Sequence, residues 1–373
     1  MPGPLEGVRV IELARILAGP WAGQTLADLG AEVVKVEAPE GDDTRQWGPP
    51  FIDRPGDGPA NRSAAYFHAT NRGKTAIAVD FRTPEGQARV RDLVRGADVV
   101  IENFKVGGLA KYGLDYPALA GLNPGLVYCS ITGFGQTGPY AERAGYDYII
   151  QGMAGLMSVT GDPAGQPQKV GVAVVDVMTG VYAATAILAA LHQRARSGRG
   201  QMIDMALMDV AVAMMANQAM NYLASGRAPG LLGNAHPNLA PYAVFPCADG
   251  WIILAVGNDG QFRRLCAILE LSPLADDPAY ATNPARVTNR PELQRLIDAR
   301  TRGIARDALL RACEAAGVPA GPINTMAEVF ADPQVIARGL RIDPEGVPGV
   351  RTPITFSDAE LALGRASPLM PRA

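Results

Sequence analysis

The stretch QKVGVAVVDVMTGVYAATAILAALHQRAR, from Gln168 to Arg196, decides how the rest of the chain is interpreted. Its first part, Val170 to Val175, is a short apolar run with β-branched residues. From Val177 onward, about 20 residues of good helix formers carry apolar side chains on nearly all sides. A surface helix would show a polar face, so this pattern predicts a central helix that is buried.

One carboxylate, Asp176, stands between the two parts. The first N–H groups of a helix have no intrahelical partner and carry partial positive charge, so Asp176 is a good candidate for an N-cap. It is also a candidate nucleophile at the bottom of a cleft. Small neighbours leave room there for a bulky ligand: Gly171, Ala173, Gly180, Ala183 and Ala184. Position and composition leave both interpretations open.

The totals describe a globular protein that is long enough for two domains. The chain has 373 residues, of which 48% are hydrophobic and 19% charged. A net charge of −3 argues against a nucleic-acid binder, although a local basic cluster can still hold an anionic small molecule.

Cysteine and histidine usage argues against disulfides and metal sites. The four cysteines are scattered without a C-x-x-C spacing, and the three histidines never stand at ligand spacing.

Met1-Pro-Gly-Pro-Leu-Glu has no signal-peptide pattern, and the most apolar windows, 177–191 and 205–220, are too short or too interrupted to span a bilayer. We therefore expect a cytoplasmic enzyme with no membrane partner.

Strand and helix patterns alternate through the first half of the chain. Strands are expected at 9–13, 32–37, 75–80, 98–102, 126–132 and 201–206. Helices are expected from Pro20 to Leu29, ended by Gly30, and from Thr83-Pro84 to Arg95. The economical architecture is a doubly wound parallel sheet, with the Pro/Gly/Asp-rich stretch 38–62 as a surface loop that carries substrate contacts or a lid.

Polar and aromatic residues gather just after several predicted strand ends. In doubly wound sheets, ligands bind beyond the carboxyl ends of the strands, and cations there suit a phosphate-bearing ligand. The alternative is that the charges are solvated loop residues. The residues concerned are Arg15, Lys74, Arg82, Asn103, Phe104 and Lys111.

The segment Gly133-Phe-Gly-Gln-Thr-Gly138 matches the dinucleotide fingerprint G-x-G-x-x-G and follows a strand. However, Pro139 follows it, no helix pattern opens there, and no acidic residue stands near 20 positions on in a second strand. A glycine-rich turn that lets backbone approach a ligand is the better interpretation.

Composition changes after Ser225. Residues 243–247 and 251–256 flank Asp249-Gly250, which predicts a hairpin, and helical patterns follow it. We therefore expect a small α+β domain at 226–325, and a large α/β domain at 1–225 completed by 326–373.

Long motifs, in order along nearly the whole chain, resemble the family III CoA-transferases of the CaiB/BaiF type. They include LEGVRVIELARILAGPWAGQTLADLGAEVVKVEAP, NRGKTAIAVD, ENFKVGGLAKYGL, YCSITGFGQTGP, GVAVVDVMTGVYAATAILAAL and GVPAGPINTMAEVFADPQV. The segments GDDTR, WGPPF, GNAHPNLAPY and GNDGQF look most like the succinyl-CoA:glutarate branch. The resemblance implies a Rossmann-like large domain, a smaller domain and an interlocked homodimer.

In that resemblance the family's nucleophile falls on Asp176. The implied reaction moves CoA from an acyl-CoA, such as succinyl-CoA, to a carboxylic acid, such as glutarate, through an aspartyl-CoA thioester. Coenzyme A is then a substrate, and no permanently bound cofactor or metal is expected.

The resemblance also assigns binding residues. CoA contacts fall on Arg15, Ala18, Lys74, Val79, Arg82, Asn103, Phe104, Lys111 and Arg143, and contacts to the acyl group or acid fall on Leu17, Arg45, Tyr146, Asp147 and His236. Arg15 and Arg45 are candidates for the free carboxylate of a dicarboxylate, because guanidinium matches carboxylate. His236 is either a further contact or a loop histidine without a role.

Three alternatives remain. An acyl-CoA racemase of the same fold would need a second base at Tyr146, where a phenol of pKa about 10 is poorly suited and is better explained as a donor to the acyl group. A formyl-CoA, oxalate or carnitine CoA-transferase is another. Two differences argue against formyl-CoA or oxalate as a substrate. Leu17 stands where formyl-CoA transferase has a glutamine, and the glycine-rich loop that covers the aspartate of that enzyme has no counterpart at 226–239. The third is a CoA-binding protein without activity.

Overall fold

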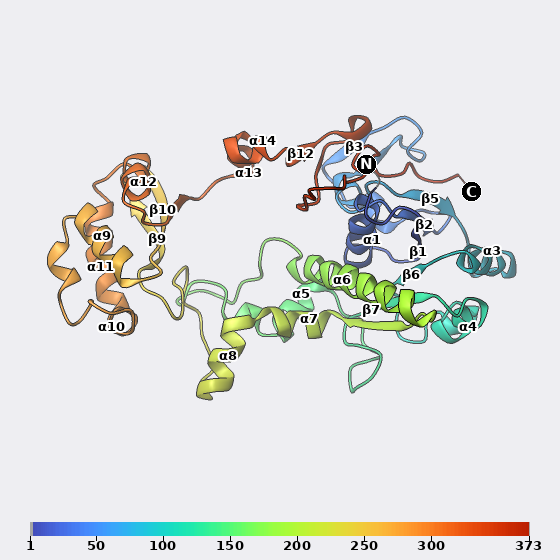
Figure 1. The fold of residues 1–373 in the computed structure, drawn as a ribbon, viewed down its shortest axis with the longest axis horizontal. Helices are drawn as coiled ribbons and strands as arrows, with labels where there is room; N and C mark the ends of the chain where they lie inside the picture. The colour runs from blue at the N-terminus through green and yellow to red at the C-terminus, as the bar shows by residue number, and fades with distance from the viewer. Residues whose placement is uncertain (1–2, 373) are drawn as a thin grey trace. The chain divides into compact units, whose positions relative to one another are not determined.

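A computed structural model describes residues 3–372, and its first compact unit is built on a parallel sheet (Figure 1). The strand order is β5–β2–β1–β6–β7–β8, and every neighbouring pair is parallel. The strands are β1 (Arg9–Glu12), β2 (Glu32–Glu37), β5 (Thr75–Ala78), β6 (Val99–Glu102), β7 (Val127–Thr132) and β8 (Met202–Ala206). The predicted doubly wound parallel sheet is therefore confirmed.

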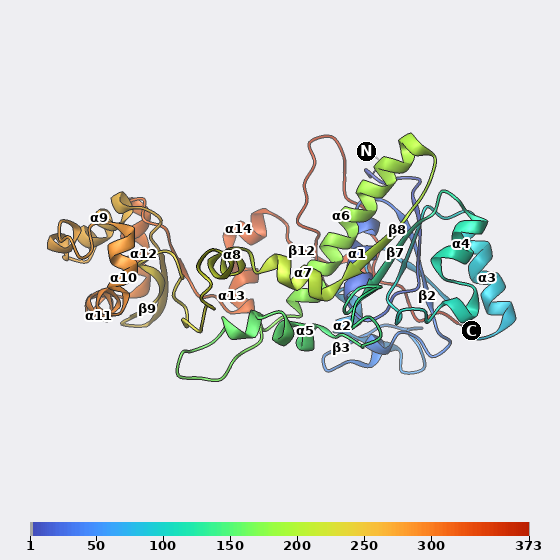
Figure 2. The ribbon, with the colours of Figure 1, turned by 90° about the horizontal axis from the view of Figure 1, so that it is seen from below.

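Helices cover both faces of this sheet (Figure 2). On one face, α1 (Ala18–Asp28), α6 (Val174–Ser197) and α7 (Leu207–Met214) share a buried apolar cluster with β1, β6 and β7. On the other face, α3 (Pro84–Arg95) and α4 (Tyr116–Leu122) share a second cluster with the same sheet. Thr83 caps α3 by accepting the N–H of Gly86 at 3.1 Å.

Helix α6 packs against α1 at very short range. At Gly180, an added Cβ would lie 2.8 Å from the carbonyl oxygen of Ala18 and 2.8 Å from Cβ of Trp21. Only glycine therefore allows this approach of the two helices.

Two expectations for α6 were wrong. The helix begins at Val174 with Ala173 as its N-cap, so Asp176 lies inside the first turn and is not the cap. The helix is also not buried on all sides, because Val181 and Tyr182 are each 43% exposed.

By length and composition alone, α6 is long and apolar enough to cross a membrane. The apolar window 177–191 was expected to be too short for this, but the helix extends beyond that window at both ends. Its buried residues, including Val175, Ala183 and Ile187, pack into the core beside the sheet. One side of α6 therefore belongs to the protein core.

The Pro/Gly-rich loop after β2 contains a short 3₁₀ turn, η1 (Asp43–Gln46), and the hairpin β3 (Phe51–Asp53) and β4 (Arg62–Ala64), followed by α2 (Ala65–His68). The C-terminal segment packs against this loop. Met370 donates its N–H to Asp57 at 2.8 Å, and Ser367 contacts His68 at 2.5 Å between Oγ and Nδ1.

The second compact unit consists of residues 157–169 and 217–332. The predicted hairpin is present as β9 (Tyr242–Cys247) and β10 (Gly250–Ala255), to which β11 (Ala320–Pro322) adds a third antiparallel strand. Its helices are α8 (Ala216–Ser225), α9 (Asp259–Ile268), α10 (Asn283–Thr288), α11 (Arg290–Thr301), α12 (Arg306–Ala315) and α13 (Met326–Ala331).

The first unit comprises residues 1–156, 170–216 and 333–373, so it also holds α5 (Asp147–Met153), α14 (Pro333–Ala337), β12 (Arg341–Ile342) and β13 (Gly349–Val350). The predicted small domain, 226–325, lies within the second unit. Residues 157–169, 217–225 and 326–332, which were assigned to the large domain, belong to the second unit instead.

Candidate active site

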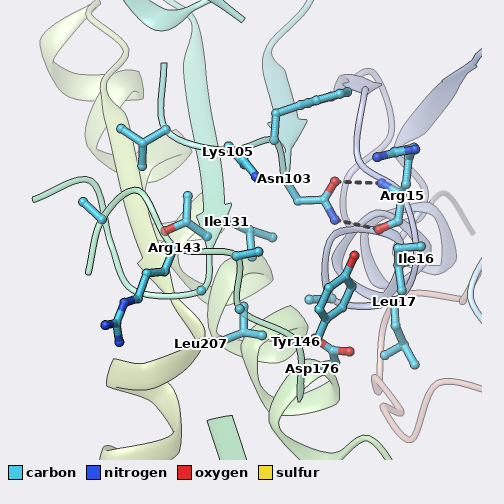
Figure 3. Close-up of a pocket in the computed structure, with 18 residues that line it drawn as sticks. Arg15, Ile16, Leu17, Asn103, Lys105, Ile131, Arg143, Tyr146, Asp176 and Leu207 are labelled. Atoms are coloured by element: carbon cyan, nitrogen blue, oxygen red, sulfur yellow. Dashed lines mark hydrogen bonds between the residues drawn. The ribbon is translucent and has the colours of Figure 1, made fainter. Parts of the chain in front are cut away.

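A cavity of about 240 Å³ opens at the carboxyl ends of β1, β6 and β7, within the first unit (Figure 3). Strand β1 is the point where the sheet order reverses, and open α/β sheets bind ligands at such a point. Eight predicted site residues line the cavity: Arg15, Leu17, Ala18, Asn103, Phe104, Arg143, Tyr146 and Asp176.

The side chain of Asn103 holds the loop that follows β1. Its Oδ1 accepts the N–H of Arg15 at 2.9 Å, and its Nδ2 donates to the Arg15 carbonyl at 2.6 Å (Figure 3). The next residue, Ile16, has φ 72°, which is strained for a β-branched residue. The amide of Asn103 therefore serves to fix a strained turn at the pocket edge, whereas the prediction assigned it to CoA.

Asp176 lies in the first turn of α6 and lines the cavity next to Tyr146 (Figure 3). Burial, and secondarily the negative charge of Asp147, raise the pKa of the Asp176 carboxyl to about 7. Strongly perturbed pKa values in a cleft are typical of functional groups. The ionised form is therefore poorly solvated, and a carboxylate in that condition is reactive toward an electrophilic carbonyl carbon.

Asp147 does not line the cavity but lies behind Asp176. One carboxylate oxygen accepts the N–H of Val175 at 2.8 Å and that of Asp176 at 3.3 Å. The N-cap residue of α6, Ala173, offers no side-chain hydrogen bond, so Asp147 supplies the missing acceptor from α5. The expectation that Asp147 contacts substrate is corrected, because its carboxylate is occupied by these donors.

Bare backbone forms part of the cavity wall. A Cβ added to Gly133 would lie 2.6 Å from Cα of Gly145, and one added to Gly145 would lie 2.5 Å from Cα of Gly133. The G-x-G-x-x-G segment thus makes a turn that lets two backbones touch, and no helix opens after it.

Lys74 is not available to a ligand, so its assignment to CoA is corrected. The ammonium group is buried and donates to Glu12 at 2.9 Å, to the Pro20 carbonyl at 2.9 Å and to Asn71 at 2.8 Å. These bonds use all three of its donors. Burial lowers its pKa to about 8, although the charge of Glu12 opposes this.

Arg45 is likewise enclosed, so its assignment to a substrate carboxylate is corrected. Its guanidinium forms two hydrogen bonds to Glu37, at 2.7 and 2.8 Å, and one to Asp57 at 3.0 Å. It also stacks over the ring of Phe67 at 3.7 Å. Both carboxylates are buried, so this is a structural ion-pair group beneath the loop.

The remaining predicted residues lie outside the cavity lining. The Val79 side chain is buried in the core. Arg82 is exposed and paired with Asp80 at 2.7 Å, and Lys111 lies over the ring of Tyr112 at 4.8 Å. His236 belongs to the second unit, where its Nδ1 accepts the N–H of Asn238 at 3.0 Å.

Several lining residues were not predicted, among them Ile16, Lys105, Val106, Ile131 and Leu207. Lys105 carried a signal, since it directly follows Asn103-Phe104 after a predicted strand. Leu207 carried no such signal, because an apolar residue at a helix start usually belongs to the core.

Within residues 3–372, no group of three or more His, Cys, Asp or Glu side chains is arranged to hold a metal ion.

Comparisons with known proteins show which family this chain resembles over nearly its whole length. The sequence profile of "CoA-transferase family III" matches residues 5–371. The chain is 64% identical to the succinate–glutarate CoA-transferase of Agrobacterium fabrum, over 98% of this chain and 92% of that protein. It is 45% identical to the succinyl-CoA:glutarate CoA-transferase of Mus musculus, over 90% and 76%.

A crystal structure of a CaiB/BaiF family protein from Brucella suis has the same fold. It superposes with a TM-score of 0.90 at 62% identity and covers 100% of this chain and 97% of that one.

Proposed function

The chain belongs to CoA-transferase family III, and from that premise we propose that it moves CoA between succinyl-CoA and glutarate, with Asp176 as nucleophile. The observation that carries the proposal is the Asp176 carboxylate, which lines the cavity at the start of α6 with a pKa raised to about 7. The two CoA-transferases of Agrobacterium fabrum and Mus musculus named above support the choice of acids.

In the first half-reaction, a carboxylate oxygen of Asp176 attacks the thioester carbonyl carbon of succinyl-CoA. The C–S bond breaks, giving a succinyl-aspartyl anhydride and CoA thiolate. The thiolate then attacks the aspartyl carbonyl of the anhydride, which releases succinate and leaves an Asp176–CoA thioester.

The second half-reaction runs the same steps with glutarate. Its carboxylate attacks the aspartyl thioester and expels the thiolate, which then attacks the glutaryl carbonyl to give glutaryl-CoA and free Asp176. No proton, water or ATP enters the balance. Exclusion of water is therefore the main demand on the site, since water would hydrolyse each intermediate.

The charges around the cavity suit these substrates. The cavity is lined by three cationic side chains, Arg15, Lys105 and Arg143. They can attract the phosphates and the carboxylate of succinyl-CoA and the two carboxylates of glutarate. Arg15 pairs with Asp43 at 3.0 Å, and both side chains are solvated enough for that pair to open at little cost.

The proposed test combines turnover with adduct detection. With succinyl-CoA alone, the Asp176 peptide should gain the mass of CoA less one water, because a carboxyl oxygen leaves with succinate, and hydroxylamine should convert it to a hydroxamate. With glutarate added, glutaryl-CoA should form. Asp176→Asn should abolish both, and Asp209→Asn serves as a control that removes a carboxylate from the first turn of α7 outside the cavity lining. An unmodified Asp176 peptide together with an active Asp176→Asn variant would refute the proposal.

We also propose that the enzyme works as a homodimer. Support comes from large apolar side chains that the single chain leaves exposed on both units. On α5 and α6 they are Tyr148, Ile149, Val181 and Tyr182, and on α8 they are Met220, Tyr222 and Leu223. These side chains include pairs that are adjacent in the sequence, Tyr148–Ile149, Val181–Tyr182 and Tyr222–Leu223, and exposed groups of large apolar side chains are typical of interaction surfaces.

A further inference from the structure

Two side chains of α5 hold the segment that leads into α6. Asp147 accepts the N–H groups of Val175 and Asp176 through Oδ2, and through Oδ1 it accepts a 2.6 Å bond from Nε2 of Gln151. Gln151 in turn accepts the N–H of Val170 at 2.9 Å. Both residues are buried: Gln151 is completely inaccessible to solvent, and Asp147 is 9% exposed. One turn of α5 therefore anchors the backbone of 170–176 at both ends.

We propose that Asp147 and Gln151 are positioning residues that clamp this segment and so fix the Asp176 carboxylate in the cavity. The inference rests on the proposed function, because it takes Asp176 as the nucleophile. Neither residue touches the substrate in this proposal. Both act through the backbone that carries Asp176.

The clamp is needed because α6 starts without a cap of its own. A helix end that lacks a side-chain acceptor leaves its first N–H groups unpaired and tends to fray. Asp176 stands in that first turn, and its neighbours upstream, Gly171 and Val172, are exposed. A displacement of about 1 Å of a reacting group can cost about 100-fold in rate.

The clamp has an electrostatic side as well. A negative charge near a helix N-terminus is favourable to the helix, but it repels the ionised Asp176 beside it. Burial is the larger cause of the raised Asp176 pKa and the charge of Asp147 the smaller. The same carboxylate thus holds the helix start and keeps Asp176 basic.

Three variants separate the bonds from the charge. Asp147→Ala removes the acceptor and the charge. Asp147→Asn keeps an acceptor for Val175 but turns an N–H₂ group toward Nε2 of Gln151. The double variant Asp147→Asn/Gln151→Glu reverses that pair, so that the carboxylate introduced at position 151 can accept both from the new amide and from the N–H of Val170. It restores the clamp while moving the negative charge one helical turn away from Asp176.

Hydrogen–deuterium exchange of peptides that cover 170–176 reports the clamp without any turnover. We expect exchange there to rise roughly tenfold in Asp147→Ala and to return to the wild-type level in the double variant. Unchanged exchange in Asp147→Ala, or no recovery in the double variant, would overturn the inference. Asp92→Asn, on the exposed surface of α3, is the matched loss of one carboxylate and should change nothing.

Kinetics supply the second readout. Asp147→Ala should lower kcat roughly 10- to 100-fold with KM within about twofold. The double variant should recover kcat. In a plot of kcat against pH, the fall in kcat on the acidic side should occur about one pH unit lower than in the wild type, because the negative charge has moved away from Asp176. If wild-type enzyme forms no Asp176–CoA adduct, the proposed function fails while exchange still decides the clamp. If the adduct forms and the double variant shows no rescue, the clamp alone fails.

Discussion

Asp176 carries a charge that its surroundings disfavour, and this has a consequence for stability as well as for catalysis. Burial and the charge of Asp147 hold its folded-state pKa at about 7, while an aspartate in an unfolded chain titrates near pH 4. Between these values the folded state binds more protons than the unfolded state. Its contribution to stability is therefore complete below about pH 4 and is lost as the pH rises through about 7.

At this scale we predict that Asp176→Asn raises the melting temperature at pH 8.5 by a few degrees, on the order of 1 kcal/mol, and leaves it unchanged at pH 4. The amide cannot ionise, so it avoids the cost of a buried charge at high pH. Scanning calorimetry of both proteins across pH checks this. An equal difference at both pH values would mean that the carboxylate is well solvated.

Single residues also show where sequence reasoning reached its limit. The strand-end rule brought Arg15, Asn103 and Phe104 to one cavity, because parallel strands end at one edge. The same rule was wrongly extended to Lys74, which directly precedes β5 and does not follow a strand, and whose partners Glu12 and Pro20 lie more than 50 positions away in the sequence. Burial of a charge is decided by such distant partners, and no local pattern reveals them.

Among the elements, α1 and α6 form the pair that supports the site. Asp176 is one turn before Gly180, where the two helices meet, and α1 begins next to the cavity at Ala18. The helical and strand patterns predicted these elements to within a few residues. The sequence also predicts one continuous helix from about Asp209 to Ser225, which in the structure is broken into α7 and α8 at Ala216, whose φ is 42°. No Gly or Pro marks that position, so the break could not be predicted.

For this helix pair we predict that Gly180→Ala destabilises the protein by about 1–3 kcal/mol, because the new methyl group overlaps Ala18 and Trp21. Activity should fall further than stability explains, because α6 shifts together with Asp176. The matched control is Gly121→Ala in α4, where a Cβ meets nothing within 4 Å. There we expect a gain of about 0.5–1 kcal/mol. Denaturant midpoints and specific activities measure both, and a neutral Gly180→Ala would contradict the packing.

For the whole molecule, the exposed apolar side chains set the main expectation. The sequence predicted a helix from Val177 onward with apolar side chains on nearly all sides, and in the single chain α6 keeps Val181 and Tyr182 at the surface. Apolar residues are needed on every face of a helix that is buried in the functional protein, including a face that is buried against another chain. The sequence pattern alone does not distinguish these faces. The excess apolar character of α6 is consistent with the proposed second copy.

We predict that the protein in solution has twice the chain mass of 39.2 kDa. Leu223→Asp, at a side chain 72% exposed on α8, should weaken association and lower the mass at micromolar concentration. Ala88→Asp on the exposed side of α3 adds the same charge elsewhere and should leave the mass unchanged. Light scattering coupled to size exclusion makes the comparison, and a monomeric wild type would contradict the proposal.

The contact between Gly133 and Gly145 limits which changes this site can accept by mutation. Because two backbones touch there, mutation has no side chain to enlarge or recharge on that wall, and any replacement at either position would push the loops apart. Adaptation to acids of other length or shape must therefore be concentrated at neighbours that do carry side chains, such as Leu17 and Tyr146. Libraries that vary those two positions and leave the glycines untouched are the economical route to a transferase with a new acceptor.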